Sequence, residues 1–219
     1  MEPMNRMAWA LWWLAVLVQL LTQLPLLDTW QPLSQVLLMP ILMLVLITRR
    51  PDSSWVLVWA LGALFWSWLG DTGPKLVGPD WGFLTMLGGF FVAQLCWIAA
   101  LAPSWRRSVL GRRRILLVPY VAVAGLLLGI ALPAAGSMAP FVIGYALVLL
   151  LMAVLATGRG LGAAIGGLLF IFSDALIALK TFVPAFDFVG SGFVVMLTYM
   201  LAQALLVRGV LGSRRRSTR

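Results

Sequence analysis

Residues 166–179 read GGLLFIFSDALIAL, an apolar run that carries one charged residue, Asp174. The run is typical of a membrane-spanning helix, which needs about 20 mostly apolar residues. A carboxylate inside such a span is costly, by roughly 2.5–3.5 kcal/mol on insertion scales, and is kept where a partner, a cavity or a substrate faces it. Asp174 is therefore the first candidate functional residue. The second is Asp71, which ends another apolar run, WSWLGD at 66–71.

The composition of the whole chain supports a membrane protein. Of its 219 residues, 62% are hydrophobic and only 11% are charged, and the mean hydropathy is +1.01. A soluble domain has about 45–50% apolar and about 25% charged residues. We therefore expect one transmembrane domain over residues 1–219, in the cell membrane and multi-pass. The chain has no His and a single Cys, so we expect no disulfide within the chain, no metal site and no cofactor.

The apolar runs predict an all-α fold, a bundle of eight transmembrane helices. Arg6 before the first run resembles the start of a signal peptide, but the run reaches Leu27 and no small-x-small cleavage site follows. We therefore expect an uncleaved first span. The predicted spans are approximately 8–27, 33–48, 55–70, 83–101, 115–132, 139–156, 161–179 and 191–207.

The positive charges predict the orientation of this bundle. With eight spans, both termini lie on one side, and of the 16 Lys and Arg residues all but Lys75 and Lys180 lie there too. Cytoplasmic loops carry such an excess, so both termini are expected inside, with a basic cytoplasmic tail at 209–219. The Arg clusters at 106–107, 112–114 and 214–216 raise the alternative of nucleic-acid binding. Because no soluble fold carries them, we expect contact with anionic lipid headgroups and no nucleic acid.

The two acids are expected on the outer side of the membrane midplane. Asp174 lies roughly 18–20 Å along the seventh span, at 1.5 Å per residue, and Asp71 ends the third span, which runs the same way. Each has a structural alternative. Asp71 could be a turn residue in GDTGP at 70–74, and Asp174 could pair with Lys180 or with a neighbouring amide.

Further polar side chains accompany the acids in the apolar spans. Tyr199 and Gln203 are four residues apart and share a helix face. Gln94 lies near the middle of the fourth span and Gln35 near the outer end of the second. Each alone can be a hydrogen bond between helices. Together with the acids they predict a polar-lined cavity, open to lipid or to the outer surface.

Several segments resemble those of a known family, the YhhN-like lysoplasmalogenases. Residues 167–178, GLLFIFSDALIA, resemble its GAxLFxxSDxxLA signature, and 199–206, YMLAQALL, resemble YYxAQxLI. Weaker likenesses are GALFWSWLGD at 62–71 to GLLFSxxGD, FVAQLCWIA at 91–99 to FxxAHxxYI, and QVLLMP at 35–40 to KPLLMP. The departures are Gln94 for His, Trp97 for Tyr and Gln35 for Lys.

The resemblance implies an eight-span membrane hydrolase that needs no cofactor. Its expected substrate is a lysoplasmalogen-type lysophospholipid, whose vinyl ether bond is cleaved to a fatty aldehyde and a glycerophospho-headgroup. It implies that Asp71 and Asp174 form the catalytic pair, with Asp174 the more probable acid. The residues expected to bind substrate or water are Tyr199, Gln203, Gln94, Gln35 and Ser173.

A different class of function fits the same residues. A non-catalytic lipid-binding protein, or a proton-coupled carrier of a small solute, would use the buried acids as a proton relay. A purely structural bundle is the third alternative. Release of aldehyde from a lysoplasmalogen favours the hydrolase, whereas proton flux without aldehyde favours the carrier.

Overall fold

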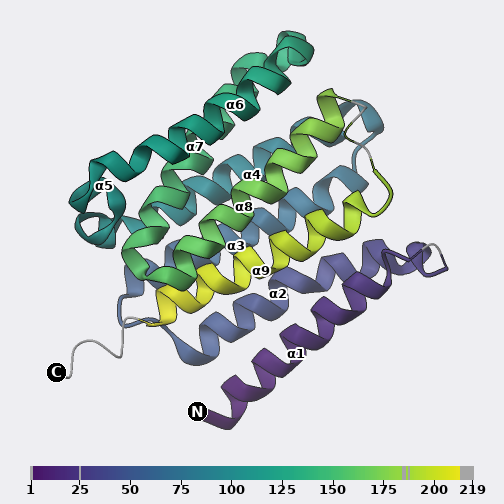
Figure 1. Ribbon diagram of the computed structural model, residues 1–219. Coiled ribbons are helices and arrows are strands. Elements are labelled where there is room, and N and C mark those ends of the chain that lie inside the picture. Colours follow the sequence, from purple (N-terminus) through teal and green to yellow (C-terminus); the bar gives the residue numbers. More distant parts are fainter. Residues whose placement is uncertain (1, 25, 184–185, 187, 213–219) are drawn as a thin grey trace. The chain divides into compact units, whose positions relative to one another are not determined.

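The computed structural model describes residues 2–24, 26–183, 186 and 188–212 (Figure 1). Within these residues the chain is helical and contains no strand, so the predicted all-α class is confirmed. A four-residue helix, α5 (Val109–Arg112), and several 3-10 turns connect longer helices. The longer helices are α1 (Glu2–Leu21), α2 (Gln31–Arg49), α3 (Ser54–Thr72), α4 (Pro79–Leu101), α6 (Leu117–Ala135), α7 (Ala139–Ala156), α8 (Leu161–Phe182) and α9 (Ser191–Leu211).

Each predicted span overlaps one of these longer helices, with one clear shift. The first span was expected at 8–27, but α1 begins at Glu2 and ends at Leu21. The polar residues Thr22 and Gln23 follow it, and Pro25 in the sequence disfavours helix in the residue before it. The apolar run therefore extends past the end of the helix.

Most of these helices are long and apolar enough to cross a membrane. Six segments of the described chain qualify by length and composition, and one of them, 114–159, contains both α6 and α7. Helix α3 is not among them, because four tryptophans and Asp71 lower its hydropathy. Six or seven long apolar helices are thus compatible with a multi-pass membrane protein. The count of eight spans and the orientation of the termini stay predictions.

The chain divides into two compact units. Unit 1 comprises Met1–Ala100 with Val210–Arg219, and unit 2 comprises Leu101–Gly209. The expectation of a single domain over 1–219 stays a prediction. Of the predicted basic tail at 209–219, the stretch 213–219 lies outside the described residues, and Gly209–Leu211 belong to α9.

In unit 1 a proline links α2 to α3. Pro40 lies inside α2 and has no N–H, so the carbonyl of Val36, four residues earlier, lacks its helical donor. The indole Nε1 of Trp68 donates to that carbonyl at 3.0 Å. This bond joins the two helices three residues before Asp71.

Close backbone contact links α3 to α4. A Cβ on Gly89 would lie 2.7 Å from the Cα of Gly70, so no side chain fits between the helices at this level. Towards the other end of α4, Trp55 Nε1 donates to the carbonyl of Ala99 at 2.9 Å. Asp71, which follows Gly70 directly, is therefore carried by a firmly packed helix.

In unit 2 adjacent glycines pack α8 against two neighbours. A Cβ on Gly167 would lie 2.8 Å from the Cα of Ala153 in α7, and one on Gly166 would lie 3.0 Å from the carbonyl oxygen of Ala202 in α9. Helix α8 is thus held between α7 and α9. Further along α8, some side chains therefore face α7 and others face α9.

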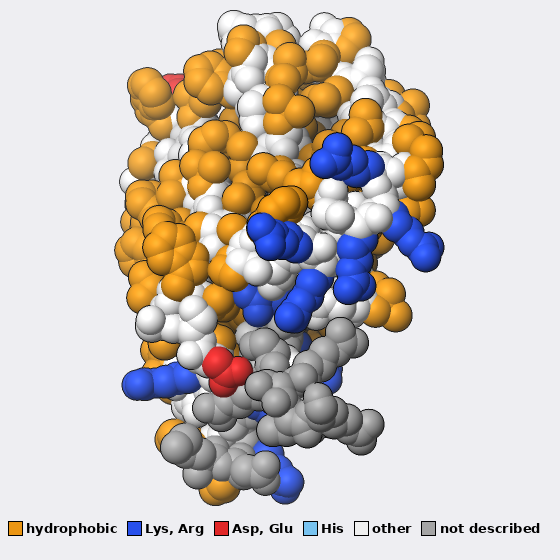
Figure 2. Space-filling model, turned by 90° about the vertical axis from the view of Figure 1, so that its left-hand side faces the viewer, with side chains coloured by type: hydrophobic (Ala, Val, Ile, Leu, Met, Phe, Trp, Pro, Cys, Tyr) orange, Lys and Arg blue, Asp and Glu red, His pale blue; other side chains and the backbone are white. Residues whose placement is uncertain are grey.

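One end of unit 2 gathers its arginine-rich connections. The backbone N–H of Val109 donates to Thr157 Oγ1 at 2.9 Å, so the connection before α6 packs against the one after α7. These connections carry Arg106–Arg107, Arg112–Arg114 and Arg159. Figure 2 shows basic side chains on a surface that is otherwise largely hydrophobic. The connections at 106–114 and at 159 thus lie at the same end of unit 2, and the sequence predicts them on the same side of the membrane.

Candidate functional site

The first polar group of the predicted site lies in unit 1, at the end of α3. Asp71 occupies the last turn of α3 and is 8% exposed. Gln35 Nε2 on α2 donates to Asp71 Oδ1 at 3.0 Å, and Lys75 Nζ donates to Gln35 Oε1 at 2.8 Å. Asp71 is therefore a buried acid bonded to a neighbouring helix and not an exposed turn residue. Two predicted site residues, Gln35 and Asp71, are in direct contact.

A charge of opposite sign lies close to this acid. Lys75 follows α3 in a 3-10 turn, Gly73–Lys75, and its ammonium also approaches the carbonyl oxygen of Pro32 at 3.5 Å. Burial lowers the pKa of Lys75 from its ordinary value of 10.5, and the Asp71 carboxylate opposes this by raising it. A nearby cation favours the ionised form of a carboxyl. Lys75 and Asp71 therefore interact electrostatically at the end of α3.

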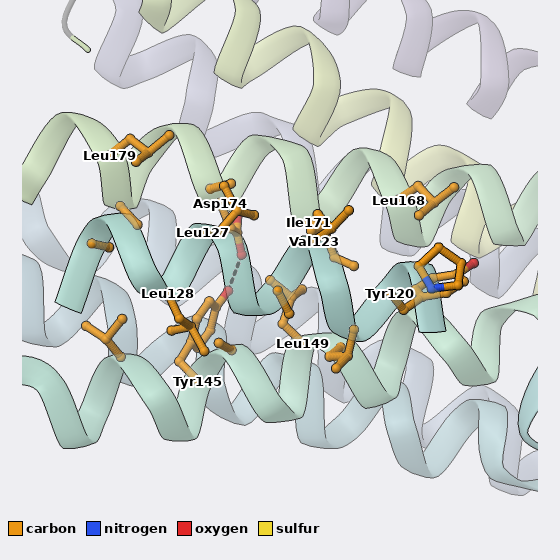
Figure 3. Close-up of a pocket in the computed structure, with 18 residues that line it drawn as sticks. Tyr120, Val123, Leu127, Leu128, Tyr145, Leu149, Leu168, Ile171, Asp174 and Leu179 are labelled. Carbon is orange, nitrogen blue, oxygen red and sulfur yellow. Dashed lines mark hydrogen bonds between the residues drawn. The ribbon is translucent and has the colours of Figure 1, made fainter. Parts of the chain in front are cut away.

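The second polar group lies in unit 2, in a cavity of about 320 Å³ between α6, α7 and α8 (Figure 3). Its walls are mainly Leu, Ile, Val and Ala side chains. Among the described residues that line it, Asp174 is the only acidic one, and Tyr120 and Tyr145 carry the hydroxyl groups. Volumes of about 300–1,000 Å³ are usual for small-molecule sites, which are apolar with a few polar groups.

Within this cavity the Tyr145 hydroxyl on α7 donates to Asp174 Oδ2 on α8. Figure 3 shows the two side chains meeting between Leu127 and Leu128 of α6. Lys180, expected as an alternative partner of Asp174, donates from Nζ to Ser191 Oγ at 2.7 Å, and its pairing with Asp174 stays a prediction. Tyr145 was not predicted. Its signal was present, because it is one of only three tyrosines and lies inside an apolar run.

Three further predicted residues lie on the α8–α9 contact and not among the cavity residues. Ser173 Oγ donates to the carbonyl of Val195 at 3.2 Å, and the ring of Tyr199 meets Phe170 edge to face at 5.5 Å. Gln203 Nε2 donates to the Tyr199 hydroxyl at 3.4 Å, which confirms that these two share a helix face. The substrate-binding role of Ser173, Tyr199 and Gln203 stays a prediction.

Gln94 on α4 of unit 1 is fully buried with unsatisfied polar atoms. Both its Nε2 and Oε1 lack a hydrogen-bond partner among the described residues, as does Nε1 of Trp97, three residues later. Residues three apart share a helix face. A buried amide without a partner costs about 1–3 kcal/mol, so these polar atoms of α4 carry an energetic cost.

Comparison with known proteins is consistent with the sequence resemblance. No curated protein and no solved structure matches the chain. The family model that does match covers residues 30–210, from the start of α2 to the last turn of α9, and includes both aspartates. Helix α1 precedes the matched range. Because the match covers far more than half of the sequence, the chain belongs to the YhhN family.

Proposed function

We propose that the protein is a membrane hydrolase that cleaves the vinyl ether bond of a lysoplasmalogen-type lysophospholipid. One observation carries the proposal: Asp174, hydrogen-bonded by Tyr145, is the acidic group of an apolar cavity between long apolar helices. Family membership supports a lysoplasmalogenase-like activity. The chain is taken to span the membrane eight times with both termini inside.

The reaction needs an acid and a base. A proton adds to the second carbon of the vinyl ether and gives an oxocarbenium ion at the first carbon. Water adds to that carbon and loses a proton, and the resulting hemiacetal separates into a fatty aldehyde and the free hydroxyl of the glycerophospho-headgroup. One water is consumed, and the proton taken up at carbon is returned. Positioned acid–base groups typically accelerate such steps by about 10²–10⁴-fold each.

Asp174 is assigned as the acid. An apolar surrounding disfavours the charged form of a carboxyl, which favours a protonated side chain. Tyr145 contacts Oδ2 and fixes the carboxyl plane, and the proton to be transferred is carried on Oδ1. Two carboxyls that work in different surroundings are a known way to divide acid and base roles.

Asp71 is assigned as the base that takes the proton from water and stabilises the cation. Its carboxylate accepts from Gln35, and Lys75 contacts the same amide. The Lys75 ammonium, which lies at the end of α3, is also suited to bind the phosphate of the headgroup. Gln94, Ser173, Tyr199 and Gln203 are taken to orient water or headgroup oxygens.

The test is an aldehyde-release assay on purified protein in detergent with a lysoplasmalogen. Asp174→Asn and Asp71→Asn are each expected to lower kcat by about 10²–10⁴-fold. Asp80→Asn, at an exposed acid in the first turn of α4, is the matched control and should keep wild-type turnover. Unchanged turnover in Asp174→Asn would remove the assignment.

A proton-coupled carrier is the second candidate. The linked Lys75, Gln35 and Asp71 side chains favour it, because a hydrogen-bonded row of polar groups at the end of a span suits proton movement. Proteoliposomes distinguish the two functions. Proton flux that is lost in Asp71→Asn, without aldehyde release in the detergent assay, supports the carrier.

A further inference from the structure

We propose that the cavity between α6, α7 and α8 binds the single aliphatic chain of the lysolipid and that its walls select the length of that chain. The inference rests on the proposed function and adds to it the site for the apolar half of the substrate. It places the bond to be cleaved beside Asp174 and Tyr145, with the chain lying along α8 away from them.

The cavity is elongated along the helices. From Asp174 its lining continues past Ile171, Val123 and Leu149 to Leu168 and Tyr120 (Figure 3). Asp174 and Leu168 are six residues apart on α8, which corresponds to about 9 Å at 1.5 Å per residue. In the opposite direction the lining reaches Leu179, in the last turn of α8. A narrow, elongated hollow of this kind matches an extended chain.

The chemistry of the walls excludes a polar occupant along most of this length. A headgroup placed between Leu149, Leu168 and Ile171 would lose its hydrogen bonds to water and gain none, whereas a hydrocarbon loses nothing there. A volume of about 320 Å³ lies at the lower end of ligand sites, so it suits one chain and not the two chains of a diacyl lipid.

The two ends of the cavity lie at different depths, and this sets the direction of the chain. Leu179 lies in the last turn of α8, at the expected outer end of that span. Leu168 lies in the interior of the same helix. The headgroup therefore belongs at the Leu179 end, and the chain runs from Asp174 towards Leu168.

The cavity is open to the apolar surface at residues of its own lining. Val123 on α6 is 50% exposed and Leu168 on α8 is 48% exposed, and both line the cavity. A chain that moves from the bilayer into this cavity exchanges one apolar surrounding for another, so its length adds little affinity. Selection must therefore come from the space that the walls leave.

Filling that space is the test. Ala124→Trp on α6 and Ala146→Trp on α7 each place an indole in the wall, and Leu147→Trp, at a neighbouring residue that is 58% exposed and outside the lining, is the matched control. At least one filled variant is expected to lower the kcat/KM ratio of long-chain to short-chain lysoplasmalogen by about tenfold or more. Leu147→Trp should keep the wild-type ratio. A wild-type ratio in both filled variants overturns the inference.

A binding measurement separates this inference from the proposed hydrolysis. The probe is an alkyl ether lysophospholipid, which has no vinyl ether to cleave, with a diazirine on its chain. Illumination is expected to label peptides of α6, α7 and α8, and excess unlabelled lysolipid should protect them while a diacyl lipid should not. If the peptides of α6, α7 and α8 are labelled in this way but no aldehyde is released from a lysoplasmalogen, the proposed hydrolysis is wrong and the chain-binding cavity still stands. Labelling elsewhere, or equal protection by the diacyl lipid, overturns the site whatever the activity.

Discussion

The contact between Tyr145 and Asp174 gives a prediction with a calculable size. Tyr145→Phe removes one hydroxyl and keeps the ring in the cavity wall, so the volume and the apolar lining are nearly unchanged. As Asp174 gives up its proton it becomes a carboxylate, and a hydrogen bond to a charged group contributes about 1.5–3 kcal/mol. If the Tyr145 hydroxyl supplies that contribution in the transition state, kcat falls by about 10–150-fold in its absence. Because the ring still fills its place, KM should change little.

The assay is aldehyde release at several substrate concentrations, which separates kcat from KM, with the melting temperature measured in the same detergent. Thr181→Val is the control, because it also deletes a hydroxyl from unit 2, on α8, but one that, within the described part of the chain, bonds to the carbonyl of Ile177 in its own helix. It should leave kcat unchanged. A kcat within about twofold of wild type in Tyr145→Phe would show that the hydroxyl does not position the acid.

Three more predictions follow from single contacts. Gly89→Ala puts a methyl group 2.7 Å from the backbone of α3 and is expected to cost about 1–3 kcal/mol of unfolding free energy, whereas Gly88→Ala, with nothing within 4 Å, should melt like wild type. Trp68→Phe deprives the Val36 carbonyl of its donor and should cost about 1–3 kcal/mol in the same measurement, with no loss contradicting the role of that bond. Because the pKa of Lys75 is lowered, its ammonium is lost as pH rises through values below 10.5, and KM for the lysophospholipid should rise there. Lys75→Arg should move that rise to higher pH, since a guanidinium stays charged, and identical profiles would refute the headgroup role.

The positions of the helices could be predicted largely from the apolar runs, because burial in a bilayer demands long uninterrupted stretches. The end of α1 could not, since Leu26 and Leu27 extend the run beyond the helix. Glycine pattern alone also fails to locate helix contacts. Gly88 and Gly89 are equivalent in the sequence, yet only Gly89 touches a neighbouring backbone. The rotation of a helix about its axis decides this, and no short run encodes it.

The candidate site was predictable where a charge stood out against apolar sequence. Asp71 and Asp174 were found in this way, and Gln35 as a polar residue in a span. Two side chains that contact these groups, Tyr145 and Lys75, were not predicted as site residues. Tyr145 lies 29 residues from Asp174 and on another helix, and Lys75 was expected only as a residue of the outer side. A charge inside an apolar run signals that a partner exists, but packing between helices chooses it.

The surroundings of the two acids argue for one division of labour over its reverse. Asp174 is met by a neutral hydroxyl in an apolar cavity, where a protonated carboxyl loses little and a carboxylate loses its hydration. Asp71 is met by an amide that a lysine also contacts, where a carboxylate is favoured and a proton is not. Exchanging the roles would require Asp174 to hold a charge in hydrocarbon and Asp71 to hold a proton beside an ammonium. Both changes are uphill, which favours the proposed roles of Asp174 as the acid and Asp71 as the base.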